Sequence, residues 1–284
     1  MDKKITVLIQ AYNEQEEIVE CIKSARLLSH TIIVVDTEST DKTVSLAKEQ
    51  NVTVHSFPYS RYVEPARNFG IEKVKTEWVF LLDVDERLTE ELAGEIVGIL
   101  IRHGRKVQDD KGVAQGDPPS LSELREGKQD ITYYKLRRKN IFAGKKWLQY
   151  GGWNSVTDYQ TRLIKKSAFK EWPQAIHSTP IIEGEAGLLK EPLLHYFHKN
   201  LETMVAKTAV YEDVESDLLF KAGKPVSTAT FFRKFLGELY RRFFKFQGFR
   251  DGTLGVIESV YQAFSKTITY LFLYEKYHEK NPNR

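Results

Sequence analysis

The most informative segment of the chain is Trp78-Val79-Phe80-Leu81-Leu82-Asp83-Val84-Asp85-Glu86, an apolar run of strand length that ends in acids. A buried strand cannot keep Asp83 and Asp85 in the core, so we expect them at the carboxyl edge of a parallel sheet, where open α/β folds bind ligands. Carboxylate oxygens suit hard divalent cations, and the segment therefore predicts a metal held against phosphates. The alternative is an ordinary turn, in which Arg87 relieves part of the repulsion among the acids.

The composition indicates a folded and nearly neutral protein. The chain has 284 residues, 41% of them hydrophobic, with 42 basic and 39 acidic residues and one cysteine. A core of this size suits either one large domain or one domain with a substantial appendage, and the charge balance argues against a general nucleic-acid binder. The first residues lack a signal-peptide pattern, and no apolar run approaches the roughly 20 residues of a spanning helix. We expect a cytoplasmic protein, either free or peripheral on the inner face of the cytoplasmic membrane.

The first hundred residues alternate apolar runs of strand length with amphipathic stretches. We expect strands at 5–9, 32–35, 52–55 and 78–82, with Asp41, Pro65 and Thr89 marking helix starts. This rhythm predicts the α/β class, with a doubly wound, mostly parallel, Rossmann-like sheet. Residues 103–130 lack apolar periodicity and are expected to form a mobile insertion, after which strand patterns resume at 131–137 and 160–164.

Beyond residue 200 the pattern becomes helical, so we expect one domain over 1–200 and a helical region over 201–284. Between residues 229 and 250 the chain has six basic residues, one acid and eight aromatic residues. Such a helix suits an anionic membrane surface, with its rings at the acyl boundary and its cations on the lipid headgroups. The alternative is ordinary packing of one stripe against the sheet, formed by Phe232, Leu236, Leu239, Phe243 and Phe246.

Polar residues follow the first two expected strands as well. Tyr12, Asn13 and Glu14 follow the first, and the segment 36–43 follows the second. The chain contains neither G-x-G-x-x-G nor G-x-x-x-x-G-K-[ST], which argues against a dinucleotide-binding Rossmann enzyme and a P-loop NTPase. A carboxylate at the end of the second strand, Asp36, could instead bind the base or ribose of a nucleotide.

Four motifs in order resemble the nucleotide-sugar half of a family 2 glycosyltransferase of the GT-A fold: Tyr12-Asn13-Glu14, the segment 36–43, Ala66-Arg67-Asn68 and Asp83-Val84-Asp85-Glu86. Later segments resemble the lipopolysaccharide-core glucosyltransferase (WaaE-like) branch, among them Arg137-Arg138-Lys139-Asn140, Gly151-Gly152-Trp153, the segment 158–163 and Pro192-Leu193-Leu194-His195. The resemblance covers most of residues 5–220.

The resemblance implies a role for each matching position. Nucleotide contacts are implied for Tyr12, Asn13, Glu14, Asp36 and Asp83, and a place near the diphosphate for Arg67. Asp83 and Asp85 would hold Mg²⁺ or Mn²⁺, with His195 as a further ligand. Structural alternatives are helix capping for Asn13 and Asp36, a solvated helix position for Arg67 and a core position for His195. The implied donor is a nucleotide diphosphate sugar, most often a UDP-sugar, and the implied acceptor is a saccharide or a lipid-linked saccharide.

The general base is the point where the sequence departs from its relatives. The resemblance to family 2 implies inversion at the anomeric carbon, which requires a group that takes the proton from the acceptor hydroxyl. From the resemblance to the WaaE-like branch we expect a His-Glu pair after the Arg-Leu strand, whereas this chain has His177-Ser178, and serine cannot serve as that base. Asp158 is the first substitute, Glu183 or Glu185 the next, and His177 itself is another. Asp158 could instead pair with Arg162.

Together these features predict a metal-dependent inverting glycosyltransferase that moves a hexose onto a cell-surface glycan or lipid-linked saccharide. A nucleotidyltransferase is a rival, although the glycine-rich, basic opening typical of that class is missing after Ile9. The second rival is a non-catalytic sugar-nucleotide-binding protein, which Ser178 motivates.

Overall fold

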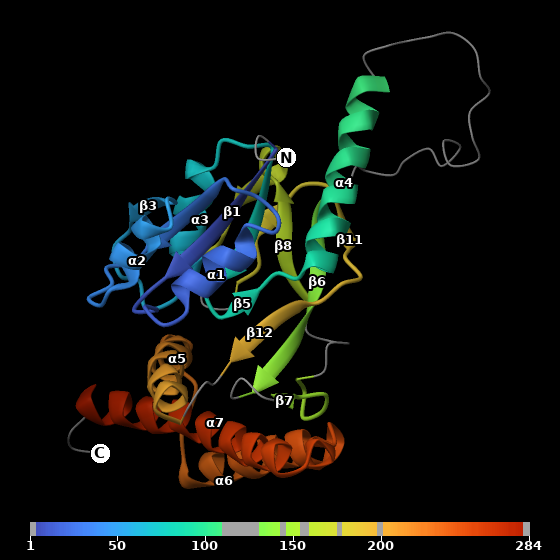
Figure 1. Cartoon of the computed structure of the whole chain (residues 1–284). Helices are drawn as coiled ribbons and strands as arrows, with labels where there is room; N and C mark the ends of the chain where they lie inside the picture. Colours follow the sequence, from blue (N-terminus) through green and yellow to red (C-terminus); the bar gives the residue numbers. More distant parts are fainter. Residues whose placement is uncertain are drawn as a thin grey trace.

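The computed structural model describes residues 4–109, 131–142, 146–153, 159–174, 178–197 and 201–280. A twisted sheet flanked by helices forms the first part, and a layer of helices forms the last (Figure 1). The strands expected in the first hundred residues are confirmed as β1 (Ile5–Ala11), β2 (Ile32–Asp36), β3 (Thr53–Ser56) and β4 (Trp78–Asp83). The helices between them are α1 (Ile18–Ala25), α2 (Thr43–Glu49) and α3 (Glu64–Lys73).

The parallel half of the sheet runs in the order β3-β2-β1-β4. Nearly all side chains of β1, β2 and β4 are buried, as expected for parallel strands covered on both faces. In the register of these strands Ala11 lies beside Asp36 and Gln10 beside Asp83. The two acids that end β2 and β4 therefore reach the same carboxyl edge, as the sequence predicted.

The sheet continues through β8 (Tyr159–Lys165), β6 (Ile131–Phe142), β12 (Leu193–Phe197) and β5 (Glu86–Arg87). Strand β8 is antiparallel to its neighbours β4 and β6, whereas β12 is parallel to β6. Short strands complete the architecture: β7 (Lys146–Trp147) and β11 (Glu185–Leu188) pair with β6, and β9 (Phe169–Glu171) pairs with β10 (Ile181–Ile182). The pairing of β5 with β12 places His195 opposite Glu86, so a residue from late in the chain reaches the acidic loop.

The helix starts follow the sequence signals. Asp41 accepts the backbone N–H of Thr43 at 2.9 Å, Pro65 lies in the first turn of α3, and Thr89 accepts the N–H of Leu92 at 3.2 Å. Helix α4 (Glu90–Asp109) continues past His103, so the first residues of the expected insertion are helical, and 110–130 lie outside the described residues. The helix continues here because the ring of His103 packs on that of Trp78 at 5.0 Å and its Nε2 lies 2.9 Å from the hydroxyl oxygen of Tyr134.

The carboxyl-terminal region consists of α5 (Leu201–Lys221), α6 (Thr228–Leu239), the π-helical η2 (Tyr240–Lys245), η3 (Gly248–Asp251) and α7 (Thr253–Lys280). In Figure 1, α5 lies between the sheet and α7, and the arrows of β6 and β12 point toward these helices. A hydrophobic cluster joins the two parts, since Phe142, Leu148 and Phe197 pack with Met204 and Leu254. The helix expected over 229–247 changes to π geometry at Tyr240, where Arg242 turns to donate to the carbonyl of Gly151 at 3.0 Å.

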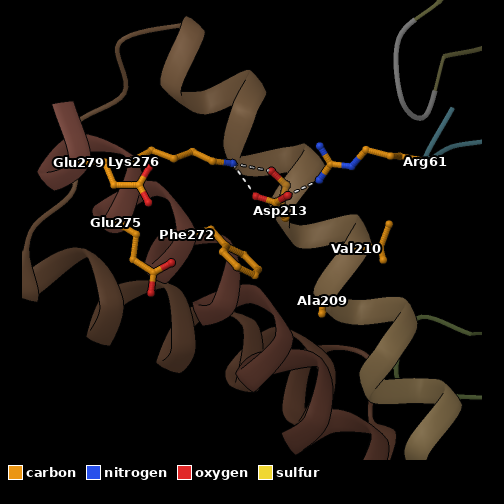
Figure 2. Close-up of a pocket in the computed structure, with 8 residues that line it drawn as sticks. All are labelled: Arg61, Ala209, Val210, Asp213, Phe272, Glu275, Lys276 and Glu279. Atoms are coloured by element: carbon orange, nitrogen blue, oxygen red, sulfur yellow. Dashed lines mark hydrogen bonds and ion pairs between the residues drawn. The ribbon is translucent and has the colours of Figure 1, made fainter.

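Ion pairs also join the carboxyl-terminal helices to the sheet domain. Asp213 of α5 pairs with Arg61, from the loop before α3, and accepts from Lys276 of α7 at 2.6 Å (Figure 2). These three residues lie on the wall of a cavity of about 460 Å³ between α5 and α7. Its lining contains none of the residues that the sequence nominates for the site. A separate 3₁₀ turn, η1 (Lys166–Ala168), links β8 to β9.

An exposed apolar ladder runs along α6 and η2. Phe232, Leu236, Tyr240 and Phe244 follow one another at helical spacing and are 65%, 57%, 63% and 59% exposed. Two members of the stripe that ordinary packing would bury, Phe232 and Leu236, therefore do not face the sheet. No helix in the described part of the chain is both long enough and apolar enough to cross a membrane.

Candidate functional site

Two loops at the carboxyl edge are tied together by Asn13. Its backbone φ of 52° turns the chain after β1, its N–H donates to the hydroxyl of Ser39 at 2.8 Å, and its side-chain oxygen accepts the N–H of Thr40 at 2.8 Å. Asn13 therefore braces the loop after β2 and does not cap α1, whose cap position is Glu17. The neighbouring Tyr12 is exposed, and its ring lies 4.4 Å from that of Tyr59.

Asp36 offers an unused acceptor at this edge. The residue is 4% exposed, and its Oδ2 accepts the N–H of Ser39 at 3.1 Å. Its Oδ1 is buried and has no hydrogen-bond partner among the described residues. An unsatisfied buried carboxylate oxygen is costly, so a donor group of a ligand would stabilise this position.

Asp83 is held between two guanidinium groups. Its Oδ1 accepts from Arg67 at 2.6 Å and its Oδ2 accepts from Arg162 at 2.6 Å. Burial opposes ionisation, but Arg162 and Arg67 overcome this effect and hold the pKa of Asp83 well below its usual range. Arg162 also donates to the fully buried Glu86 at 2.5 Å, so one arginine binds two acids of the loop, and burial raises the pKa of Glu86.

Arg87 does not provide the relief that the sequence suggested. Its guanidinium pairs with Glu17 and donates to the carbonyl oxygens of Val84 and Glu86 at 2.6 and 2.7 Å. The charge of the acidic loop is instead balanced by Arg67 and Arg162, with Arg138 3.7 Å from Glu86. Arg87 was the nearest base in the sequence, but the extended geometry of β5 directs its side chain toward α1.

Asp85 and His195 face each other across the edge. The distance from Asp85 Oδ2 to His195 Nε2 is 3.7 Å, and both residues are largely buried. The side-chain nitrogen of Asn140 donates to the carbonyl of Trp153 at 3.1 Å, which leaves the amide oxygen facing His195 Nδ1 at 2.6 Å. Nδ1–H therefore donates to Asn140, and Nε2 is the ring nitrogen that faces Asp85. A carboxylate oxygen and a ring nitrogen that face each other in this way can hold a cation between them when Nε2 carries no proton.

Lys207 of α5 is the third group at Asp85. Its Nζ lies 3.4 Å from Asp85 Oδ2 and 3.9 Å from Glu14 Oε1. The carboxylate of Asp85 raises the pKa of Lys207, so the ammonium group is charged at neutral pH. Burial opposes the ionisation of Asp85, but His195 and Lys207 more than compensate and lower the pKa of this carboxyl group.

Asp85 and His195 can hold a divalent ion only when a bound ligand supplies further coordinating atoms. Among the described residues, no group of three or more His, Cys, Asp and Glu side chains is arranged to hold a metal. Asp85 and His195 supply one oxygen and one nitrogen, and Asp83 is already bound by two arginines. Mg²⁺ in proteins is commonly bound by one or two carboxylates together with substrate phosphates and water. The residues present therefore fit a metal that arrives with a phosphate ligand.

Only some of the candidate bases lie in the part of the chain that the structure describes. Asp158 and His177 lie outside the described residues. Ser178 donates its hydroxyl to the carbonyl of Pro173 at 2.6 Å, which is a structural contact. Glu183 is exposed and pairs with Lys170 at 2.9 Å, and Glu185 is an exposed residue of β11. Arg162, proposed as a partner of Asp158, is already bound to Asp83 and Glu86.

Sequence reasoning missed Asn140 and Lys207 as members of the site. Asn140 was visible only as part of a motif, and its link to His195 depends on the pairing of β6 with β12. Lys207 looks like any solvated lysine in the sequence. Only the position of α5 against the carboxyl edge brings it to Asp85.

Similar proteins cover nearly the whole chain. A glycosyltransferase of Rickettsia conorii is 25% identical over 266 residues, which cover 94% of this chain and 88% of the relative. The lipopolysaccharide core biosynthesis glycosyltransferase LpsC of Rhizobium meliloti is 24% identical over 284 residues, which cover 96% of this chain and 93% of that protein.

Solved structures show a more distant likeness. A crystal structure of S. aureus TarS residues 1–349 in complex with UDP-GlcNAc has 14% identity and a TM-score of 0.46, and covers 99% of this chain and 93% of that one. The glucosyl-3-phosphoglycerate synthase of Mycobacterium tuberculosis with Mn²⁺, UDP and its product has 16% identity, a TM-score of 0.44 and coverage of 79% and 82%.

The family assignment rests on the sequence model for glycosyl transferase family 2, which matches residues 6–172 and thus more than half of the chain. The matched segment contains β1 to β4 and every acid of the loop at the end of β4. The parallel order β3-β2-β1-β4, with its acids at the carboxyl edge, confirms the predicted doubly wound α/β sheet. The chain is a glycosyltransferase and belongs to glycosyl transferase family 2.

Proposed function

We propose that this glycosyltransferase moves a hexose from a nucleotide diphosphate sugar in a metal-dependent, inverting reaction. The observation that carries the proposal is the position of Asp85 Oδ2 opposite His195 Nε2, at a distance of 3.7 Å. These two groups would hold Mg²⁺ or Mn²⁺ against the donor diphosphate. When bound, the ion neutralises charge on the leaving group, a Lewis-acid role worth several kcal/mol.

The nucleotide would lie across the ends of β1 and β2. The free Oδ1 of Asp36 would accept an N–H or O–H from the base or ribose, and the exposed ring of Tyr12 offers a stacking surface. Asn13 and Glu14 would shape the loop around it. Arg67 and Asp83 form a rigid pair beside the diphosphate position, because each is fixed by the other.

The acceptor and the base are proposed from the sequence. LpsC is named for lipopolysaccharide core biosynthesis, and we propose a cell-surface saccharide or lipid-linked acceptor of that kind. Asp158 or His177 would take the acceptor proton, since Ser178 is engaged with Pro173. The exposed ladder on α6 and η2, bordered by Arg233 and Lys245, would hold the enzyme on an anionic membrane face.

The test is calorimetry of UDP-, GDP-, ADP- and dTDP-sugars with and without Mn²⁺. One donor is expected to bind in a metal-dependent manner to the wild type, and Asp85→Ala is expected to lose this binding. Glu20→Ala is a matched control, because Glu20 is an exposed acid on α1. Melting curves of both variants confirm that they remain folded. Absence of binding by any donor to the wild type would contradict the proposal.

Product analysis separates the rivals. Release of a nucleoside diphosphate in the presence of an acceptor supports glycosyl transfer. Release of pyrophosphate would indicate a nucleotidyltransferase, and binding with no product for any acceptor tested would indicate a sugar-nucleotide-binding protein.

A further inference from the structure

Lys207 differs from the other cations around the acidic loop. The side chains of Arg67, Arg138 and Arg162 are 10%, 17% and 2% exposed and pair with Asp83 or Glu86 of the acidic loop. The side chain of Lys207 is 45% exposed and extends on a flexible stem from α5. It is therefore the one of these four cations that can move without breaking the buried network.

The position of Lys207 conflicts with a metal on Asp85. Its ammonium group lies 3.4 Å from Oδ2, the same oxygen that faces His195 Nε2. An ammonium group has three donors and no lone pair, so it cannot be a metal ligand, and it repels a dication at close range. Lys207 and a metal cannot both occupy this side of Asp85.

A bound donor would resolve the conflict. A diphosphate delivers several negative charges to the carboxyl edge, within reach of a lysine that has just been displaced from Asp85. Charge-assisted hydrogen bonds from an ammonium group to phosphate oxygens are among the stronger polar contacts. Glu14, 3.9 Å from the same Nζ, limits how far the side chain departs.

We propose that Lys207 is a phosphate-binding residue that holds Asp85 in the donor-free enzyme and transfers to the donor diphosphate when the metal binds. The inference rests on the proposed function. It makes metal and nucleotide binding cooperative, because Lys207 competes with the metal alone but assists the metal–nucleotide pair. During transfer, the acceptor oxygen forms a bond to the sugar carbon and gives its proton to the general base, while the bond from that carbon to the phosphate oxygen breaks and leaves its electron pair on the diphosphate that Lys207 contacts.

The test exploits two effects of opposite sign. Mn²⁺ binding to the free protein is measured by electron paramagnetic resonance, and UDP binding with saturating Mn²⁺ is measured by calorimetry. Lys207→Met is expected to bind Mn²⁺ alone at least about threefold more tightly, because a competitor is removed. The same variant is expected to bind UDP about tenfold more weakly, since a charge-assisted contact is lost. Uridine, which lacks phosphates, should bind both proteins equally.

Controls distinguish this role from a structural one. Lys221→Met changes an exposed lysine on the same helix and should leave both affinities unchanged. Lys207→Arg keeps the charge and should retain most of the UDP affinity. Unchanged or uniformly weaker binding of Mn²⁺ and UDP by Lys207→Met would overturn the inference while the proposed function stands. If the wild type binds none of UDP, GDP, ADP and dTDP in the presence of Mn²⁺, the inference and the proposed function are both wrong.

Discussion

The orientation of His195 depends on one buried amide. Asn140 accepts Nδ1–H of His195 and donates to the carbonyl of Trp153, so its side chain sets the ring tautomer. Removing such an outer partner commonly costs 10- to 100-fold in metal affinity, and we expect Asn140→Leu to weaken Mn²⁺ binding by about this factor in the presence of nucleotide. Asn140→Asp keeps an acceptor for Nδ1–H and should lose much less. Equal affinities for the two variants in calorimetry would contradict this role.

Individual residues also show where sequence reasoning reached its limit in the site. Asp36, Asp83 and Asp85 could be placed at one edge, because a parallel strand that ends in an acid has few alternatives. The partners of these acids could not be found in this way. Arg162 and Lys207 reach the loop from β8 and α5, and a single sequence does not encode which of many bases makes such a long-range contact.

At the scale of the element, helix α7 crosses close to η3 because Gly248 and Gly255 have no side chains at the point of contact. A Cβ atom on Gly255 would lie 2.0 Å from the carbonyl oxygen of Gly248 and 2.6 Å from Cβ of Asp251. Because backbone must move to admit a methyl group, we expect Gly255→Ala to lower the free energy of unfolding by about 1–3 kcal/mol in urea titrations. Gly237→Ala on α6 meets no atom within 4 Å and should raise it by about 0.5–1 kcal/mol. Equal effects of the two substitutions would argue against the crossing.

Helix α7 also carries a buried acid that makes stability depend on pH. Glu258 is 2% exposed, and burial raises its pKa from 4.5 to about 7, against the lowering effects of Gln262 and Arg242. The folded state thus binds a proton that the unfolded state has lost, and stability falls as pH rises from about 4.5 through 7. Glu258→Gln should be more stable than the wild type at pH 8 by up to about 3 kcal/mol, with little difference at pH 5. A difference that stays constant in urea titrations at the two pH values would contradict this assignment.

The elements predicted best are those in which local pattern and burial agree. Strands β1, β2 and β4 are continuous apolar runs, and α4 is capped by Thr89 at the expected residue. The change to π geometry at Tyr240 and the pairing of the two-residue β5 with β12 could not be predicted, because both depend on contacts with distant segments. Tertiary contacts override local propensity at these positions.

At the scale of the whole molecule, a hydrophobic cluster and several hydrogen bonds join the carboxyl-terminal helices to the sheet domain. Met204 and Leu254 pack on Phe142 and Phe197 of the sheet domain, and Asp251 accepts the N–H groups of Gln149 and Tyr150 at 3.0 and 2.8 Å. Arg242 holds Gly151, and Asn140 connects Trp153 to His195. The carboxyl-terminal helices therefore support the strand that carries His195, the proposed metal ligand, and they present their exposed ladder on another face.

The exposed ladder on α6 and η2 is expected to bind anionic membranes. Phe232, Leu236, Tyr240 and Phe244 would insert into the acyl boundary, while nearby Arg233 and Lys245 contact anionic headgroups. We expect the full-length protein to co-sediment with vesicles that contain anionic lipid at low salt, and to be released progressively as ionic strength rises. Neutral vesicles should retain less protein, because the attraction of the bases is lost.

Matched substitutions test whether the ladder itself is responsible. Leu236→Glu and Phe244→Glu place a charge on the exposed face of α6 and η2 and should each abolish most of the sedimentation without unfolding the protein. Leu188→Glu changes a residue of β11 that is 61% exposed and belongs to the sheet domain, and it should sediment as the wild type does. An equal loss for all three variants would indicate nonspecific charge repulsion. A folded wild type that stays in the supernatant at low salt would show that the ladder does not bind this membrane. Low salt favours binding most, so the apolar area and the positive charge of the ladder would then be insufficient.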